Sequence, residues 1–496
     1  MDPQASRPAS TMEEGAAAGT PAARIGLWLG PGLALAMLAL DPPAGLGAPG
    51  WQTLALLAWM VAWWVTEPVP IAATSLLPIV WLPMGGILSA ADATAAYADP
   101  IIFLFIGGFI VAVAIERWRL HQRIALGMIA AVGTRPVALV GSFALASGLL
   151  SMWISNTATT LMLIPTALGV AHAIGRSGGL SPEARASLTA ALALVVAYGA
   201  SIGGIGTPVG SPTNLVAMRY LQEQGLSLGF AQWTTIALPL MAVMLFAAWA
   251  VLSRPLRGHG ANPEVAALLA AERRALGPIT RPERRVLAVF ALVALAWMFN
   301  PLLKKLPALS GLNDTAVAIC GALLLFALPS GDAAAPRARL LEWKHAERIP
   351  WGVALLFGGG LSVAAAMEAH GVSGWLGGAL SGMRTLSPLL VLLALAALTV
   401  LASEFMSNVA TLAAFLPVVG AVSVATGLPP LVLVFCASMA ASLAFMMPAG
   451  TAPNAIAYGT GEVKIRYMLR VGLWLNLIGI VAIAAISEWW APRVLG

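Results

Sequence analysis

The chain has 496 residues, of which 59% are hydrophobic and only 10% carry a charge, against about 25% charged in an average soluble domain. This composition excludes an ordinary soluble enzyme. The net charge of +6 comes from basic residues in short segments between apolar runs, which favours a membrane protein over a nucleic-acid-binding one.

The chain begins with a polar segment, residues 1–24, that is rich in Ala, Pro and Ser and lacks the pattern of a cleaved signal. We predict a disordered tail there. The apolar runs that follow predict eleven membrane crossings, of which 186–222 and 430–460 are broken by Gly and Pro. The expected crossings are residues 25–42, 51–66, 69–84, 101–116, 186–222, 233–252, 286–303, 313–329, 350–368, 430–460 and 468–490.

Two further pairs of apolar runs have a polar tripeptide between them. Ser155-Asn156-Thr157 separates residues 136–154 from 158–175, and Ser407-Asn408-Val409 separates 387–406 from 410–425. Irregular backbone at membrane depth is tolerated only where protein or a cavity covers it. We therefore predict two re-entrant helical hairpins with the tripeptides at their tips, in an all-α integral membrane protein of about eleven transmembrane helices.

Basic residues predict the orientation of the chain. Segment 254–285 holds seven arginines, and segment 336–348 adds three arginines and a lysine. Such segments face the cytoplasm, so counting spans places the N-terminus in the cytoplasm and the C-terminus outside. Lys304 and Lys305 fall on the opposite side. We expect a multi-pass protein of a bacterial inner membrane.

Blocks of the sequence resemble each other at fixed spacings. Leu104-Phe105-Ile106-Gly107-Gly108 is similar to Leu356-Phe357-Gly358-Gly359-Gly360, and Ser155-Asn156 recurs as Ser407-Asn408, both 252 residues on. Ser211-Pro212-Thr213-Asn214 is similar to Thr451-Ala452-Pro453-Asn454, 240 residues on. Segment 117–123 holds three arginines, whereas its counterpart 369–375 has no Lys or Arg. We therefore expect two inverted repeats, which in secondary transporters bring broken helices together at a central binding site.

The hairpin tips and the Pro/Asn breaks offer uncharged polar groups within the bilayer. Amide, hydroxyl and freed carbonyl oxygens suit a hard cation such as Na⁺, while asparagine amides, hydroxyls and helix N-termini can receive an anion. No Lys or Arg lies near either tip in the sequence. A bound dianion would then need Na⁺ for charge compensation, which predicts coupled transport.

Other interpretations of these residues are open. Each break alone fits an ordinary kinked helix, and Glu404, between Ser403 and Asn408, is a candidate proton relay as well as a structural group. No phosphate-binding loop, nucleophile, metal cluster or cofactor motif is found in the sequence. We therefore expect neither an enzyme nor an organic cofactor, and a lipid bilayer rather than nucleic acid as the partner.

Together the motifs resemble those of the divalent anion/sodium symporter family, from about residue 50 to 490. They are Trp63-Trp64-Val65-Thr66-Glu67-Pro68-Val69-Pro70, the two Ser-Asn tips, Glu404-Phe405-Met406-Ser407-Asn408 and the two Pro/Asn breaks. The resemblance implies Na⁺-coupled uptake of small divalent anions, most simply C4-dicarboxylates such as succinate, malate and fumarate. It also implies a homodimer in which each protomer has a scaffold and a moving transport domain that works as an elevator.

This resemblance divides the chain into six segments. They are the tail (1–24), the first scaffold segment (25–133), the first transport segment with the first hairpin and broken helix (134–252), a cytoplasmic linker (253–285), the second scaffold segment (286–384) and the second transport segment with the second hairpin and broken helix (385–496). The two scaffold segments would together form the scaffold domain, and the two transport segments the transport domain.

The resemblance also implies ligands. The first sodium site would use Ser151, Ser155, Asn156 and the carbonyl of Gly210, and the second would use Ser403, Asn408 and the carbonyls of Met406 and Gly450. The substrate carboxylates would meet Asn156, Thr157, Ser211, Asn408, Thr451 and position 409. The family's second tip is usually Ser-Asn-Thr, and Val409 here cannot donate a hydrogen bond. Transport of sulfate or another oxyanion, and anion exchange, are therefore the alternatives.

Overall fold

The computed structural model describes residues 21–176, 181–260, 263–332, 335, 337–347, 349–379 and 386–495. Within these ranges the chain is helical and contains no strand, apart from one isolated bridge between Pro329 and Arg339. Eight of the described helices are long and apolar enough to cross a membrane. The all-helical membrane fold is therefore confirmed, while most of the predicted tail lies outside the described residues.

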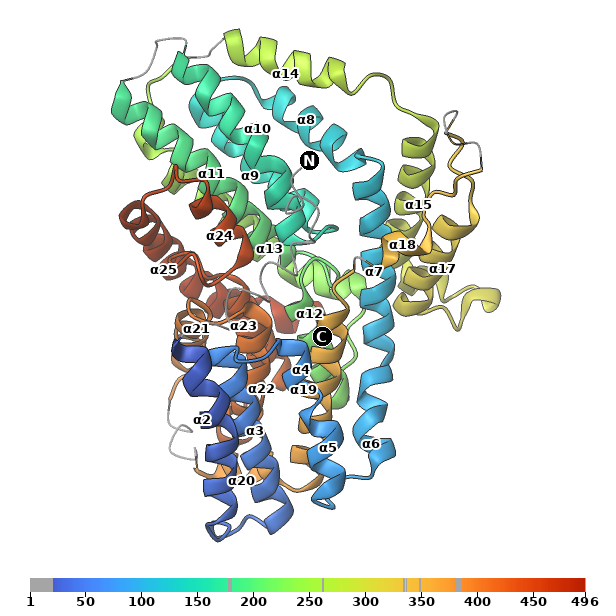
Figure 1. Ribbon diagram of the computed structural model, residues 1–496, viewed down its shortest axis with the longest axis vertical. Helices are drawn as coiled ribbons and strands as arrows, with labels where there is room; N and C mark the ends of the chain where they lie inside the picture. The colour runs from blue at the N-terminus through green and yellow to red at the C-terminus, as the bar shows by residue number, and fades with distance from the viewer. Residues whose placement is uncertain are drawn as a thin grey trace.

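Among the described residues, seven α-helices precede the first hairpin region. α2 (Pro21–Leu38) and α3 (Ala48–Thr66) pack together, and α7 (Pro100–Arg117) runs along the long axis with α17 (Asp314–Ala327) beside it (Figure 1). Between them lie α4 (Ile71–Thr74), α5 (Leu77–Met84) and α6 (Ala90–Ala95). The prediction of one continuous helix over 69–84 is wrong, because Pro78 cannot donate a hydrogen bond to Thr74 and its ring clashes with that carbonyl.

α8 (Leu120–Val132) occupies a segment expected to be a loop. The chain turns sharply at Arg119, whose φ is 55°, and the helix resumes at once. The two arms of the first hairpin follow as α9 (Pro136–Ser151) and α10 (Asn156–Arg176). The first broken helix consists of α11 (Pro182–Gly204) and α12 (Pro212–Glu223), and α13 (Phe230–Leu252) ends this half.

The middle of the chain packs back onto an N-terminal helix, since α17 contacts α7. The expected linker contains a helix, α14 (Pro263–Ala275), which packs against α8 and α10. The remaining elements are α15 (Arg281–Met298), α16 (Asn300–Leu303), α17 (Asp314–Ala327), α18 (Trp343–Ala346), α19 (Trp351–Ala369) and α20 (Val372–Ala379).

The C-terminal region repeats the pattern of hairpin and broken helix. α21 (Pro388–Ser403) and α22 (Asn408–Thr426) form the second pair of arms, and α23 (Pro430–Ser442) and α24 (Ala452–Gly459) form the second broken helix. α25 (Ile465–Trp489) and α26 (Ala491–Leu495) complete the chain. These bounds place each predicted tip and each predicted break at the junction of two helices, with the second helix beginning inside the motif.

The two broken helices lie at the centre of the molecule. Every residue of α11 from Leu188 to Gly204 and of α23 from Leu431 to Ser442 is buried, as expected for helices that are apolar on all sides. The halves interlock around them, because α10 packs against α24 and α22 packs against α12. The second arm of each hairpin therefore contacts the broken helix of the other half.

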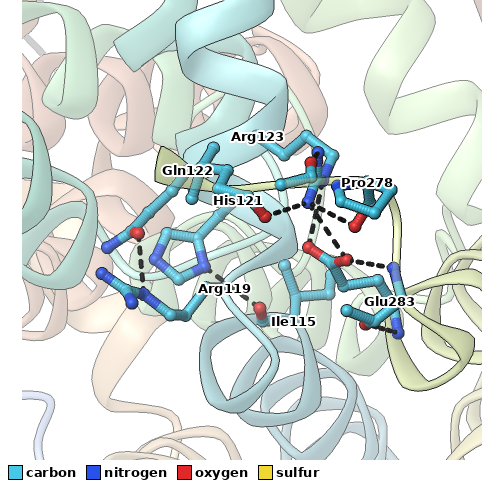
Figure 2. Close-up of polar contacts among 10 residues, drawn as sticks. Ile115, Arg119, His121, Gln122, Arg123, Pro278 and Glu283 are labelled. Carbon is cyan, nitrogen blue, oxygen red and sulfur yellow. Dashed lines mark hydrogen bonds and ion pairs between the residues drawn. The ribbon is translucent and has the colours of Figure 1, made fainter. Parts of the chain in front are cut away.

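An ion pair fastens α8 to the start of α15 (Figure 2). The Arg123 guanidinium lies 3.0 Å from Glu283 Oε1 and also donates to the carbonyls of Leu276 and Gly277. Burial raises the pKa of Glu283, but hydrogen bonds from Thr280 and Arg123 lower it, and the net pKa lies below the ordinary value. The ionised carboxylate therefore stabilises the folded protein at neutral pH.

We expect Glu283→Gln to destabilise the protein by about 1–2 kcal/mol at pH 7, because it weakens a charge-assisted contact that is only partly screened. Since the folded-state pKa is depressed, this contribution is present above the ordinary carboxyl pKa and is lost as the pH falls through the lower folded-state value. Melting temperatures of both proteins between pH 7 and pH 3 measure the difference. The exposed Glu347 supplies the control, and an equal effect of Glu347→Gln would contradict the assignment.

Candidate functional site

The first hairpin tip is organised by Asn156. α9 ends at Ser151 and α10 begins at Asn156, so the connecting turn exposes backbone carbonyls. The Ser151 hydroxyl donates to Asn156 Oδ1 over 2.6 Å, and Ser155 Oγ accepts from the Ala158 N–H at 3.2 Å. Ser155 directly precedes α10, where serine is preferred because its side-chain oxygen accepts a hydrogen bond from a free N–H of the first turn.

Oxygen atoms gather where this tip meets the first break. A Cβ on Gly204 would lie 2.4 Å from Asn156 Oδ1, and one on Gly210 would lie 2.7 Å from the Gly204 carbonyl oxygen and 3.0 Å from that of Ser151. The Met152 carbonyl oxygen is 3.1 Å from the same position. We call these four oxygens, Asn156 Oδ1 and the carbonyls of Ser151, Met152 and Gly204, the first oxygen cage. Only glycine at these two positions leaves room for it.

The second tip repeats this arrangement. Ser403 Oγ, at the end of α21, lies 3.1 Å from Asn408 Oδ1 and 2.6 Å from the Ala441 carbonyl oxygen. A Cβ on Gly450 would lie 2.9 Å from the Ser403 carbonyl oxygen and 3.3 Å from that of Glu404. Asn408 Oδ1 and the carbonyls of Ser403 and Glu404 form the second oxygen cage. Met406 lies in the turn between the two arms.

One asparagine holds each break in shape. Asn214 Nδ2 donates to the carbonyls of Gly204 and Thr207 at 2.8 and 2.7 Å, and Asn454 Nδ2 donates to those of Ala444 and Met447 at 3.0 and 3.1 Å. The two bonds in each half satisfy carbonyls that the interrupted helix leaves free. The predicted substrate residues Ser211 and Thr451 are the residues before α12 and α24, and Thr451 Oγ1 accepts from the Asn454 N–H.

A chain of hydroxyls connects the two halves. Thr213 Oγ1 lies 2.8 Å from Ser211 Oγ and 2.8 Å from Ser442 Oγ, at the end of α23. The second tip also faces the first half, because α22, which begins with Asn408 and Val409, packs on α12. Correspondingly α10, which begins with Asn156 and Thr157, packs on α24. The predicted site residues therefore lie on four elements that contact one another in pairs.

A cavity of about 380 Å³ lies between α3, α19 and the first turn of α7 on one side and α12 and α22 on the other. Of the six predicted substrate residues, only Val409 lines it. Arg219 lines it too, so a basic side chain of α12 and Val409 of the second tip share one cavity wall. Arg219 is paired, since its Nε lies 2.9 Å from Asp99 Oδ2 and its Nη2 lies 3.3 Å from Glu223 Oε1.

Glu404 has a structural role that the sequence left open. Its carboxylate is buried and accepts hydrogen bonds from the N–H groups of Phe445, Met446 and Met447, at 2.7 to 3.1 Å. Asn476 Nδ2, on α25, donates to it over 2.6 Å. A carboxylate bound by several donors stabilises an irregular backbone, so Glu404 holds the second break open. Asn476 has no signal in the sequence that singles it out.

Comparison with known proteins identifies relatives over nearly the whole chain. A family model described as the sodium:sulfate symporter transmembrane region matches residues 31–495. The sodium-dependent dicarboxylate transporter SdcS of Staphylococcus saprophyticus is 38% identical over 478 residues, covering 95% of this chain and 92% of that protein. SdcS of Staphylococcus aureus strain USA300 is 38% identical over 479 residues with the same coverage.

Solved structures share the fold at lower identity. The YdaH transporter of Alcanivorax borkumensis aligns with a TM-score of 0.56 and 14% identity, covering 96% of this chain and 99% of that one. MtrF of Neisseria gonorrhoeae aligns with a TM-score of 0.58 and 15% identity, covering 94% and 97%. This likeness concerns the fold alone.

Proposed function

Because the chain belongs to the sodium:sulfate symporter family and is a membrane transporter rather than an enzyme, we propose that it couples an inward Na⁺ gradient to the uptake of small divalent anions. The most suitable substrates are C4-dicarboxylates such as succinate, malate and fumarate. The observation that carries the proposal is the pair of oxygen cages, each built around an asparagine at a hairpin tip.

The cages have the chemistry of cation sites. Their oxygens belong to carbonyl and amide groups, the ligands that hard cations prefer. These oxygens lie close to Gly204, Gly210 and Gly450, where a larger side chain would clash with them. We assign the first Na⁺ to Ser151, Ser155, Asn156 and Gly210. We assign the second to Ser403, Met406, Asn408 and Gly450.

The substrate site is proposed between the cages. The residues assigned to it are Asn156, Thr157, Ser211, Asn408, Val409 and Thr451, which lie at the starts of α10, α12, α22 and α24 or directly before them. Helix N-termini attract anions, and two Na⁺ ions would offset the charge of a dianion. The relatives named sodium-dependent dicarboxylate transporters support this choice of substrate.

Sulfate or another oxyanion is the second candidate, as is exchange of anions. The description of the matching family names sulfate, and Val409 offers one hydrogen bond fewer than threonine would. A thermal-shift screen of succinate, malate, fumarate, sulfate and phosphate, each with NaCl and with choline chloride, separates the candidates. We expect dicarboxylates to raise the melting temperature only with Na⁺. Stabilisation by sulfate alone would favour the second candidate.

The transport step is proposed to be an elevator movement within a homodimer of an inner membrane, with the N-terminus in the cytoplasm. The seams between the expected scaffold and transport domains support it. The first seam is the contact of α7 with the first break. Gly108 of α7 packs tightly there, since a Cβ on it would lie 2.8 Å from Val209 Cγ1. At its counterpart Gly360 of α19 a Cβ would meet no neighbouring atom within 4 Å, and Gly360 lines the cavity. Movement would close the second seam and open the first.

Alanine at the two glycines tests this movement. Gly108→Ala overpacks the closed seam, so we expect it to lower the melting temperature and also slow uptake. Gly360→Ala has room in this structure, so the melting temperature should be unchanged, yet uptake should fall about tenfold, because overpacking costs about 1–3 kcal/mol once the second seam closes. Normal uptake by Gly360→Ala would contradict the movement.

A further inference from the structure

Two asparagine oxygens are buried in matched positions without a hydrogen-bond partner. Asn214 Oδ1 and Asn454 Oδ1 have no partner among the described residues, and both side chains are fully buried. The two residues are 240 residues apart and follow the same Pro/Asn pattern. The hydroxyls of Thr159 and Thr411, 252 residues apart, are also buried and unpartnered within the described ranges.

The orientation of each amide is fixed by its other atoms. Nδ2 of Asn214 contacts two carbonyl oxygens, and so does Nδ2 of Asn454. A flipped amide would bring its oxygen against two acceptors, so the hydrogen-bond network determines which atom is the oxygen. The unpartnered atom is therefore an acceptor in both halves. Leaving such an acceptor buried and unpaired costs about 1–3 kcal/mol.

Asn214 Oδ1 lies within reach of an ion in the first oxygen cage. Its amide nitrogen is 2.8 Å from the Gly204 carbonyl oxygen, and the two heavy atoms of an amide terminus are about 2.2 Å apart. Asn214 Oδ1 is therefore at most about 5 Å from a cage oxygen. Two oxygen ligands of one cation, each at about 2.3–2.6 Å, can be separated by that distance. Asn454 Nδ2 is likewise 3.0 Å from the carbonyl oxygen of Ala444, which lies 240 residues after Gly204.

We propose that Asn214 and Asn454 are sodium ligands, each contributing its side-chain oxygen to the cation site of its own half. This rests on the proposed function, which assigns a Na⁺ to each cage, and it adds one oxygen to each site. The same side chain then fixes the break through its nitrogen and binds the ion through its oxygen. Sodium binding is thereby linked to the shape of the broken helix that carries Ser211 or Thr451.

Sodium-dependent melting of the full-length protein tests the proposal without any substrate. NaCl is titrated against choline chloride at constant ionic strength, and the half-saturating Na⁺ concentration is read from the melting temperature. We expect Asn214→Ala to raise this concentration at least tenfold. Asn214→Asp replaces Nδ2 by an oxygen that faces the carbonyls of Gly204 and Thr207, so the protein without Na⁺ should melt at a lower temperature. Its added negative charge should still lower the half-saturating Na⁺ concentration about threefold or more. Asn454→Asp should act in the same direction.

The control is Ser201→Ala. The Ser201 hydroxyl on α11 is also buried without a partner among the described residues, but the residue 240 positions later is Ala441, so the feature is not repeated. This variant should leave the half-saturating Na⁺ concentration within twofold of the unmodified value. If the asparagines serve only to fix the breaks, every variant loses stability without Na⁺ and keeps the same Na⁺ dependence, which overturns the inference. A lack of Na⁺ stabilisation in the unmodified protein would overturn the proposed function as well.

Discussion

Proteoliposomes that contain the protein should accumulate succinate at least tenfold faster with an inward Na⁺ gradient than with choline outside. The cages contain no formal positive charge of their own, and Arg219 is already paired with Asp99 and Glu223. Burying a dianion without compensating charge is expensive. Bound Na⁺ supplies that charge, so substrate binding and transport should depend on it.

Varying the membrane potential in the same experiment tests how many Na⁺ ions accompany each dianion. If more than two Na⁺ accompany each dianion, an inside-negative potential should accelerate uptake, since it contributes about 2.3 kcal/mol per net charge per 100 mV. A potassium gradient with valinomycin sets the potential, and radiolabelled succinate measures uptake. Equal uptake in choline would reject sodium coupling, and uptake that needs an anion inside instead would identify an exchanger.

Replacing Asn156 or Asn408 by alanine should reduce uptake at least a hundredfold. Each asparagine supplies an oxygen to its cage and begins the helix proposed to receive the substrate. Loss of either removes a ligand from the cation and a hydrogen-bonding group from the anion at once. Uptake in proteoliposomes, normalised to folded protein by size-exclusion chromatography, measures the effect.

Asn313→Ala is the matched control for these variants. Asn313 caps α17 by accepting a hydrogen bond from the Ala316 N–H, so its loss should cost about 1 kcal/mol of stability and leave uptake within about threefold. If Asn156→Ala and Asn408→Ala transported as well as Asn313→Ala, the assigned sites would be wrong.

The sequence predicted the helix ends correctly where polar residues or prolines interrupt an apolar run. The Ser-Asn tips and the Pro/Asn runs interrupt long apolar segments, and helices begin at Asn156, Pro212, Asn408 and Ala452 as a result. α8 and α14 escaped prediction because each has only 13 residues, too few for a membrane span, and α14 is also mixed in polarity. The break at Ser75 and Leu76 was missed because the run 69–84 is apolar, which predicts a continuous span that includes Pro78.

Contacts between distant segments could not be predicted from local pattern. Arg219 lies eight residues beyond Ser211, yet packing of α12 on α22 brings it into the lining shared with Val409. Glu404 was singled out from the sequence as a candidate proton relay or structural group, but its partners come from the second break and from Asn476, about 40 and 70 residues later. Such pairings depend on tertiary packing, for which one sequence holds no direct signal.

The interlocked packing of the two halves sets an order of events during biosynthesis. The second arm of the first hairpin, α10, has its partner α24 in the last tenth of the chain. At about 5–20 residues per second, the ribosome needs roughly 15–55 s to make the intervening 276 residues, from position 176 to 452. Until then the polar tip at Asn156 lacks this cover. During this interval the tip at Asn156 must be shielded by helices of the first half or by the insertion machinery. Only then can α10 pack against α24.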